Sequence, residues 1–359
     1  MSVHEILIAI MAFFAILGAL DRIFGNKLGL GQEFENGILA MGSLAMAMIG
    51  IICLAPVLAN LLKPVVVPIY NFLGADGAMF AGTILACDMG GGALAKELTS
   101  DSQAALLGGV ITGSMLGATV VFTIPVAMGI LQDEDKPHLA KGILCGIVTI
   151  PVGVLVGGLV AGFPLLMVLR NLVPIVLIAL LIALGLWRFE KIMIKGFALF
   201  GKIIIALITA GLVCAIVEAL TGFVIIPGLA PISDGFETVG AIAIVLAGAF
   251  PLVYTITKLL KKPLLKLGKV LGVNDTAAAG LIASLANSIA TFEMMKNMDR
   301  RGKVVNVAFA VSAAFVFGDH MGFTAGFAPE MLPAVIVGKL AGGITAVAVA
   351  LVLTRKEKV

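Results

Sequence analysis

Charged residues are scarce in this sequence. Only 13% of its 359 residues are Asp, Glu, Lys or Arg, whereas 60% are hydrophobic, and the mean hydropathy is +1.15. A soluble domain of this length does not need so much apolar surface for its core. The net charge of +3 is too small to indicate nucleic-acid binding. The sequence therefore predicts an integral membrane protein whose partner is the lipid bilayer.

Catalytic and cofactor motifs are also missing. The four cysteines form no CxxC pair and lie in apolar segments, so we interpret them as small buried hydrophobes. No His/Cys/Glu cluster has metal-site spacing, no GxSxG precedes a helix, and there is no P-loop. These absences disfavour an enzyme or a primary pump. We expect no catalytic residue, no metal and no cofactor.

The apolar residues lie in long continuous blocks. Blocks of roughly 20 residues recur along the chain, and each is long enough to cross the hydrocarbon layer as a helix. Barrel strands would instead alternate over roughly ten residues. The 43 glycines fit close helix packing in lipid. The predicted fold class is an all-α polytopic membrane protein.

The distribution of Lys and Arg suggests how these blocks cross. If the blocks at 74–96 and 273–296 are re-entrant hairpins, only Lys63, Lys96 and Arg170 face outside, and nearly all other basic residues face the cytoplasm. If every block crosses, the positive-inside rule fails. We therefore predict nine transmembrane helices and two hairpins, with the N-terminus outside and a cytoplasmic tail at 354–359. The blocks cover 3–20, 36–60, 74–96, 104–131, 138–162, 171–187, 197–219, 236–257, 273–296, 304–329 and 333–353.

The chain also resembles itself at an offset of about 200 residues. The stretch at 31–42 echoes 233–244, and GADGAMFAGTILACD at 74–88 matches 272–287. Shared low-complexity composition is the alternative explanation. We predict one transport domain at 1–353, with a first repeat at 3–162, a linking helix at 165–190 and a second repeat at 197–353. Because the repeats begin an odd number of crossings apart, they are inverted, which is typical of secondary transporters.

Polar residues interrupt both predicted hairpins and are candidates for substrate binding. Asp88 precedes three glycines in the first, and Asn287 and Ser288 interrupt the second. An ionisable group in the hydrocarbon zone is costly and marks function by default. The alternative role at each break is a helix cap.

Asp319 and His320 lie near the middle of the 304–329 block. Asp319 is spaced to share a helical face with Phe315 and Phe323, and a carboxylate beside aromatic rings suits a small ammonium ligand. Packing or lipid-facing phenylalanines are the alternative. His320 is a candidate hydrogen-bond partner of the substrate, a proton relay, or a partner of Asp319.

Three more charged side chains bear on the site. Lys96 and Glu97, secondary candidates for the site, lie toward the end of a hairpin, where interfacial pairing is the default. Lys339 is a lone cation in the last block. We expect it to snorkel to the surface rather than pair with a buried carboxylate.

Four motifs resemble the bacterial ethanolamine-utilisation permease family, EutH. They are LACDMGG (85–91), LAKEL (94–98), MMKNMDRRGKVVN (294–306) and AFAVSAAFVFGDHMGFTA (308–325). The resemblance implies a permease of the cytoplasmic membrane that imports ethanolamine for breakdown by a cobalamin-dependent lyase. It carries over Asp88, Lys96, Glu97, Asn287, Asp319 and His320. The family reads Asn-Asn where this chain has Asn287-Ser288, which leaves the role of Ser288 open.

The resemblance predicts secondary or facilitated transport of the ethanolammonium cation. Asp88 and Asp319 would balance its charge, and Asn287, Ser288 or His320 would bind its hydroxyl. A transporter of another small amine or of a nucleoside-like solute is the alternative, as is a membrane sensor that binds ethanolamine without moving it. The coupling ion stays open, and so does the choice between a monomer and a homo-oligomer.

Overall fold

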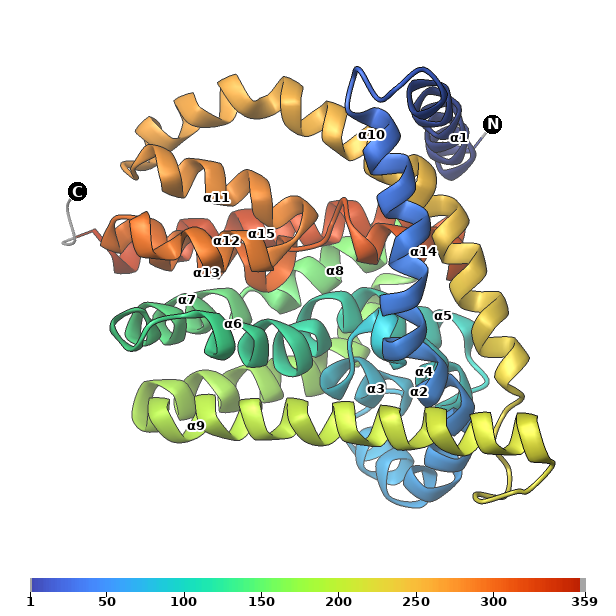
Figure 1. The fold of residues 1–359 in the computed structure, drawn as a ribbon. Helices are drawn as coiled ribbons and strands as arrows, with labels where there is room; N and C mark the ends of the chain where they lie inside the picture. The colour runs from blue at the N-terminus through green and yellow to red at the C-terminus, as the bar shows by residue number, and fades with distance from the viewer. Residues whose placement is uncertain (1, 356–359) are drawn as a thin grey trace.

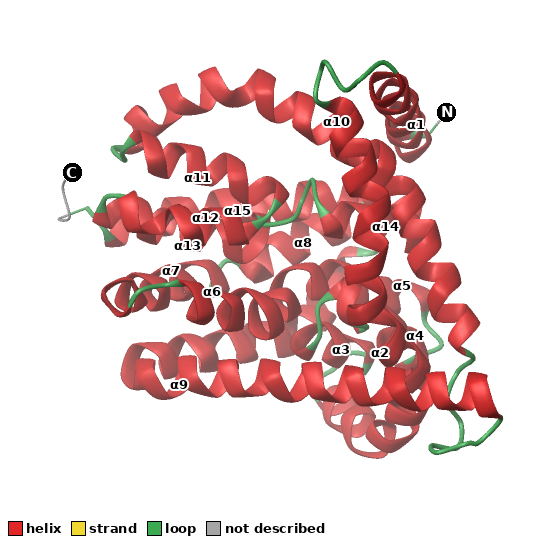
Figure 2. Ribbon diagram, in the orientation of Figure 1, coloured by secondary structure: helices red, strands yellow, loops and turns green. Residues whose placement is uncertain are grey.

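The computed structural model describes residues 2–355, without the side chains of residues 260–262, 264, 265, 267 and 269. All regular structure in this range is helical (Figure 2). Seven helical stretches in it are long and apolar enough to cross a membrane, which confirms the all-α polytopic class. These stretches are Val3–Ile23, Leu30–Phe72, Ser102–Ile130, Asp133–Val160, Leu165–Thr221, Ile232–Leu259 and Pro329–Leu353.

Helices α1 (Val3–Ile23), α2 (Leu30–Phe72) and α10 (Ile232–Leu271) pack against one another (Figure 1). Helix α2 runs well past residue 60, where the hydropathy pattern ended the expected span. The helix contains Pro56, Pro64 and Pro68 and does not end at any of them. Proline usually bends or ends a helix, but neighbouring helices in a membrane protein can satisfy the freed backbone groups.

Helix α9 (Leu165–Thr221) consists of two antiparallel arms (Figure 1). Phe189 has non-helical dihedral angles, with φ −134° and ψ 41°. A Cβ atom on Gly185 would lie 2.8 Å from the sulfur of Met193. In a straight helix these two residues would be about 12 Å apart along the axis. The chain therefore turns back at Phe189, and the expected blocks 171–187 and 197–219 correspond to the two arms.

The first predicted hairpin is built from two short helices, α3 (Ala78–Ile84) and α4 (Gly91–Leu98). Leu85 and Ala86 between them are extended, and the one-turn helix η1 (Cys87–Met89) follows. At the base, the hydroxyl of Thr99 donates a hydrogen bond of 2.8 Å to the carboxylate of Asp76. This segment therefore leaves and returns at the same place.

The second predicted hairpin has the same construction, with α11 (Asp275–Ala286) followed by α12 (Ser288–Met294) and η5 (Met295–Asn297). The break falls at Asn287, whose φ of −156° and ψ of 128° are extended. At the base, the backbone N–H of Asn274 donates to the carboxylate of Asp299 at 2.8 Å.

The block at 104–131 is helical throughout but irregular. A turn of α-helix, α5 (Ser102–Ala105), leads into the π-helices η2 (Leu106–Gly117) and η3 (Thr119–Thr123) and then α6 (Ile124–Ile130). The block at 138–162 is split into α7 (Lys136–Ile147), after η4 (Asp133–Asp135), and α8 (Ile150–Val160).

The block at 304–329 is not one continuous helix, contrary to the hydropathy pattern. It is divided into α13 (Arg300–Ala313) and α14 (Asp319–Phe327), and η6 (Pro329–Met331) and α15 (Leu332–Leu353) follow. The break exists because the chain pairs with the second hairpin instead. The N–H of Phe315 donates to the carbonyl of Ser284 at 3.0 Å, and that of Phe317 to Leu285 at 2.9 Å.

Several connections lie at one end of the bundle. The α6–α7 connection, the turn of α9, the α10–α11 connection and the C-terminal end lie at the left of Figure 1, whereas the α9–α10 connection lies at the right. The base of the first hairpin is close to the start of α9, because the side chain of Asn171 accepts a hydrogen bond of 2.7 Å from the N–H of Asp76. The base of the second hairpin follows the α10–α11 connection.

Candidate functional site

A cavity of about 750 Å³ lies between α2, η3 with α6, the second arm of α9, and the breaks at η1 and at 315–320. Most of its wall is aliphatic or aromatic. An apolar cavity with a few polar groups is the usual form of a small-molecule site. Its polar and charged lining residues are Ser43, Asp88, Lys202, Thr209, Asp319 and His320.

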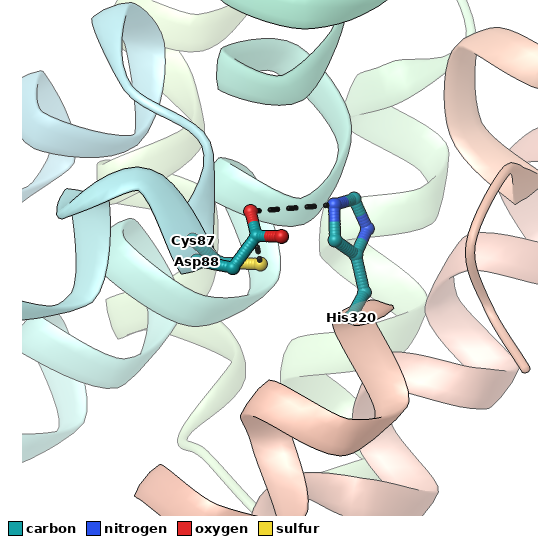
Figure 3. Close-up of side chains that lie close together, drawn as sticks. All are labelled: Cys87, Asp88 and His320. Atoms are coloured by element: carbon teal, nitrogen blue, oxygen red, sulfur yellow. Dashed lines mark hydrogen bonds and ion pairs between the residues drawn. The ribbon is translucent and has the colours of Figure 1, made fainter. Parts of the chain in front are cut away.

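The break in the first hairpin places Asp88 at this cavity. Gly90, directly after η1, has a φ of +91°, and a Cβ atom there would lie 2.2 Å from the side chain of Ile51. Only glycine therefore allows α4 to start in this position. The carboxylate of Asp88 has weak partners: Nε2 of His320 at 3.7 Å and the sulfur of Cys87 at 4.0 Å (Figure 3).

Asp319 is the first residue of α14, and its carboxylate is even less satisfied. It lines the same cavity, and within the described part of the chain it has no hydrogen-bond or ion-pair partner. Its charge acts on Asp88, so the two carboxylates are close enough to repel each other. Two under-partnered carboxylates in one cavity are suited to a cationic ligand.

His320 connects this cavity to Lys339 of α15. Lys339 is 1% exposed and does not snorkel to the surface, contrary to expectation. Its ammonium donates to Nδ1 of His320 at 3.0 Å and to the backbone carbonyl of Ser114 in η2. Segments from both halves of the sequence therefore meet at this side chain.

The hydrogen bond from Lys339 also assigns the tautomer of His320. An ammonium group only donates, so Nδ1 must accept and carries no proton. The imidazole is then neutral with its proton on Nε2, the nitrogen that faces Asp88. His320 is thus oriented toward Asp88 and Lys339 rather than toward Asp319.

Two aromatic rings form the wall beside the carboxylates. Phe315 and Phe122 both line the cavity and meet edge to face, with ring centroids 5.4 Å apart. The Phe315 ring also lies 5.2 Å from the imidazole of His320. Phe315 has a φ of +62°, which is costly for a residue with a side chain and is often found at functional sites. Because of the break, Phe315 does not share a helical face with Asp319.

The other predicted site residues lie away from this cavity. Phe323 is buried and stacks on Phe327 with centroids 4.8 Å apart, and Lys96 lies 3.7 Å above the Phe327 ring. Glu97 is exposed on α4.

Asn287 and Ser288 also lie outside the cavity wall. The Asn287 side chain accepts a hydrogen bond from the N–H of Ile289, as a helix cap does. The hydroxyl of Ser288 is buried without a hydrogen-bond partner among the described residues. The cavity therefore brings together Asp88, Asp319, His320 and Phe315 of the predicted set, and the roles of the others stay predictions.

One cluster has the composition of a metal site. The sulfur of Cys87, a carboxylate oxygen of Asp88 and a ring nitrogen of His320 all lie within 4.8 Å of one another (Figure 3). Sulfur and imidazole are ligands that zinc accepts. The buried ammonium of Lys339 on the other ring nitrogen opposes a second cation here. We therefore do not assign a metal to this cluster.

The sequence marks Lys339 as a lone lysine in an apolar block, but it does not show how deeply the side chain is buried. A lysine in an apolar block reaches water if the block faces lipid near its end and stays buried if other helices surround it. Helix packing decides between these cases. Nothing in the sequence marks Phe122 as a site residue, because its block contains no ionisable residue.

The fold defines a multi-pass membrane protein, and two carboxylates line a cavity between its helices. Residues 3–353 match the family model described as "Ethanolamine utilisation protein, EutH". The chain belongs to this family.

Curated relatives cover almost the whole chain. It is 61% identical to the "Probable ethanolamine permease EutH" of Listeria monocytogenes over 99% of its length and 95% of the relative. The Escherichia coli protein of the same name is 48% identical over 99% of this chain and 97% of the relative. The "Uncharacterized protein YxeR" of Bacillus subtilis is 52% identical, with 99% and 96% covered. No solved structure is significantly similar to this chain.

Proposed function

We propose that this protein is a permease that imports ethanolammonium across the bacterial cytoplasmic membrane by facilitated or secondary transport. Two relatives are named probable ethanolamine permeases, and membership of their family supports the same substrate here. The observation that carries the proposal is the pair of under-partnered carboxylates, Asp88 and Asp319, in one largely apolar cavity. The reaction is transport, so the substrate leaves chemically unchanged.

The cavity offers a partner for each end of ethanolammonium. The ammonium is a donor of three hydrogen bonds, which Asp88 and Asp319 accept. The faces of Phe122 and Phe315 add an attraction for the cation. The substrate hydroxyl accepts from Nε2–H of His320. Asn287 and Ser288 contribute only in a conformation that exposes the second hairpin break.

The proposed topology has nine crossings and two re-entrant hairpins in inverted repeats. The crossings are α1, α2, the α5–α6 segment, the α7–α8 segment, the two arms of α9, α10, the α13–α14 pair and α15. The hairpin bases, at Asp76 and at Asn274, lie near opposite ends of the bundle, which supports the inversion.

The cytoplasmic side is assigned from the basic residues. Lys136 begins α7, Arg188 is next to the turn of α9 and Arg300 begins α13, and these connections lie at the end of the bundle where the C-terminal residues lie (Figure 1). The positive-inside rule then puts this end and the C-terminus in the cytoplasm, and the N-terminus outside.

The cavity reaches toward this end, because Gly129 and Lys202 line it. Toward Lys96, the stacked rings of Phe323 and Phe327 fill the space between α4 and α14. This arrangement is an inward-facing state.

Uptake of labelled ethanolamine into liposomes that contain the purified protein tests this function. A membrane potential of 100 mV, negative inside, should accumulate a monovalent cation about fifty-fold without an added ion gradient. Binding without net flux would identify a sensor. Inhibition by uridine instead of ethanolamine would identify a nucleoside-type transporter, and failure to bind ethanolamine at all would refute the proposal.

A further inference from the structure

The buried ammonium of Lys339 has no direct carboxylate contact among the residues that the structure describes. Its ammonium contacts a backbone carbonyl and a neutral imidazole nitrogen, both of which are dipoles. Asp88 lies on the other side of the His320 ring, 3.7 Å from Nε2, so the charges of Lys339 and Asp88 act on each other across the imidazole. A buried charge is stable only if its surroundings compensate it. The charge of Lys339 therefore contributes to the electrostatic potential in the cavity.

The charges around the cavity can be counted. With both carboxylates ionised and Lys339 protonated, Asp88 and Asp319 contribute two negative charges and Lys339 one positive charge, and His320 is neutral because its Nδ1 accepts from Lys339. Lys202 also lines the cavity, but it is exposed and lies outside the buried part of the site. The buried part of the site is then left with a single negative charge. One monovalent ammonium compensates it, whereas a divalent ammonium leaves one positive charge in excess.

We propose that Lys339 is a specificity-determining residue that matches the charge of the cavity to a monoamine and rejects diamines. This inference rests on the proposed function, in which a small ammonium is the ligand. Lys339 does not touch the substrate. It acts through the electrostatic potential that its ammonium produces at Asp88. It also acts through the hydrogen bond that orients His320. The cavity, at about 750 Å³, is large enough for either kind of amine, so charge rather than size must distinguish them.

The first test compares ethanolamine with putrescine, which is a dication at neutral pH because both of its amines are lysine-like. Binding to the purified protein is measured by calorimetry, so the result does not depend on flux. In the wild type, ethanolamine should bind more tightly than putrescine. In Lys339→Met, which keeps the apolar stem without the charge, the ratio of the two affinities should move toward putrescine by about tenfold or more. The matched control Lys191→Met, at an exposed lysine that does not line the cavity, should keep the wild-type ratio.

The second test is a rescue. Asp88→Asn alone leaves Lys339 opposite Asp319 only, so the buried site has no net charge and should lose ethanolamine binding. Adding Lys339→Met to Asp88→Asn returns the site to a single negative charge. The double variant should bind ethanolamine about tenfold more tightly than Asp88→Asn. It should also fold if Lys339→Met alone does not, because Asp88 is neutralised together with Lys339.

Each outcome decides the inference. A lysine that only supports the structure would lower stability in Lys339→Met without changing the ratio of affinities, and that result would overturn the proposal. A double variant no better than Asp88→Asn would overturn it too. If the wild type binds neither amine, the proposed function fails. If the wild type transports ethanolamine but Lys339→Met keeps its preference, only the role of Lys339 fails.

Discussion

The ammonium of Lys339 donates a hydrogen bond of 3.0 Å to Nδ1 of His320, and this contact ties α15 to α14 beside the cavity. It fixes the side of the imidazole that carries the proton, and so presents an N–H group toward Asp88. It also places the ammonium of Lys339 beside the site that we propose for the ethanolammonium cation.

Asp319→Asn should abolish ethanolamine uptake while the protein still folds. Asp319 has no partner in the described part of the chain, so losing its charge removes attraction for the substrate without breaking a contact. Loss of a buried charge pair typically costs about 2–5 kcal/mol of binding free energy. Uptake into liposomes and elution from a size-exclusion column are the measurements. Asp133→Asn, at an exposed residue paired with Lys136, is the matched control. Wild-type uptake by Asp319→Asn would remove Asp319 from the site.

Phe315→Leu should weaken ethanolamine binding by about 0.5–2 kcal/mol, because the ring face is lost while the apolar volume is largely kept. Leucine meets the same positive φ as phenylalanine, so the backbone cost is unchanged. Calorimetric titration of the purified protein measures the effect. Phe323→Leu, at a buried ring outside the cavity wall, should lower thermal stability instead and leave the affinity as it was. Equal affinity loss in both variants would contradict a specific role for Phe315.

Single cysteines should report the sides of the two hairpins. At Lys63 and Ser100, on either side of the first hairpin, they should react with an impermeant maleimide added outside intact cells. At Lys266 and Arg300, on either side of the second, they should react only from the cytoplasmic side. The native cysteines are buried or half-buried and give a low background. Opposite labelling of the two positions that flank one hairpin would show that it crosses the membrane.

Gly50→Ala should destabilise the protein strongly, because a Cβ atom there would lie 1.9 Å from the carbonyl oxygen of Ile208 in α9. Both helices form the cavity wall, so overpacking of about 1–3 kcal/mol should also reduce ethanolamine binding. Gly42→Ala in the same helix is the matched control, since nothing lies within 4 Å of its added Cβ atom. It should be neutral or slightly stabilising, since alanine favours helix over glycine. Thermal unfolding in detergent compares the two.

The sequence predicts the breaks better than it predicts the helices. Asp88 and Asn287 interrupt apolar blocks rich in alanine and glycine, and both lie at points where the helix stops. A polar residue beside small residues favours a break whatever surrounds it, so this information is local. The position at which α2 ends cannot be inferred from the local sequence. Its three prolines are accommodated by neighbouring helices.

Depth inside the bundle is the other property that the sequence alone does not supply. Lys339 is buried because α14, η2 and α15 converge on it, and these segments are far apart in sequence. Phe315 takes a positive φ because its N–H reaches Ser284. Asn287 and Ser288 occupy the predicted break but not the cavity wall. Tertiary contacts between distant segments decide each of these positions.

The backbone bonds between the two breaks constrain the order of assembly on the ribosome. The carbonyl groups of Ser284 and Leu285, at the end of α11, accept from the N–H groups of Phe315 and Phe317. Unsatisfied carbonyls are costly in hydrocarbon. The second hairpin therefore cannot settle into its final position until residue 317 has emerged. The final packing of this hairpin therefore depends on a segment that is synthesised after it.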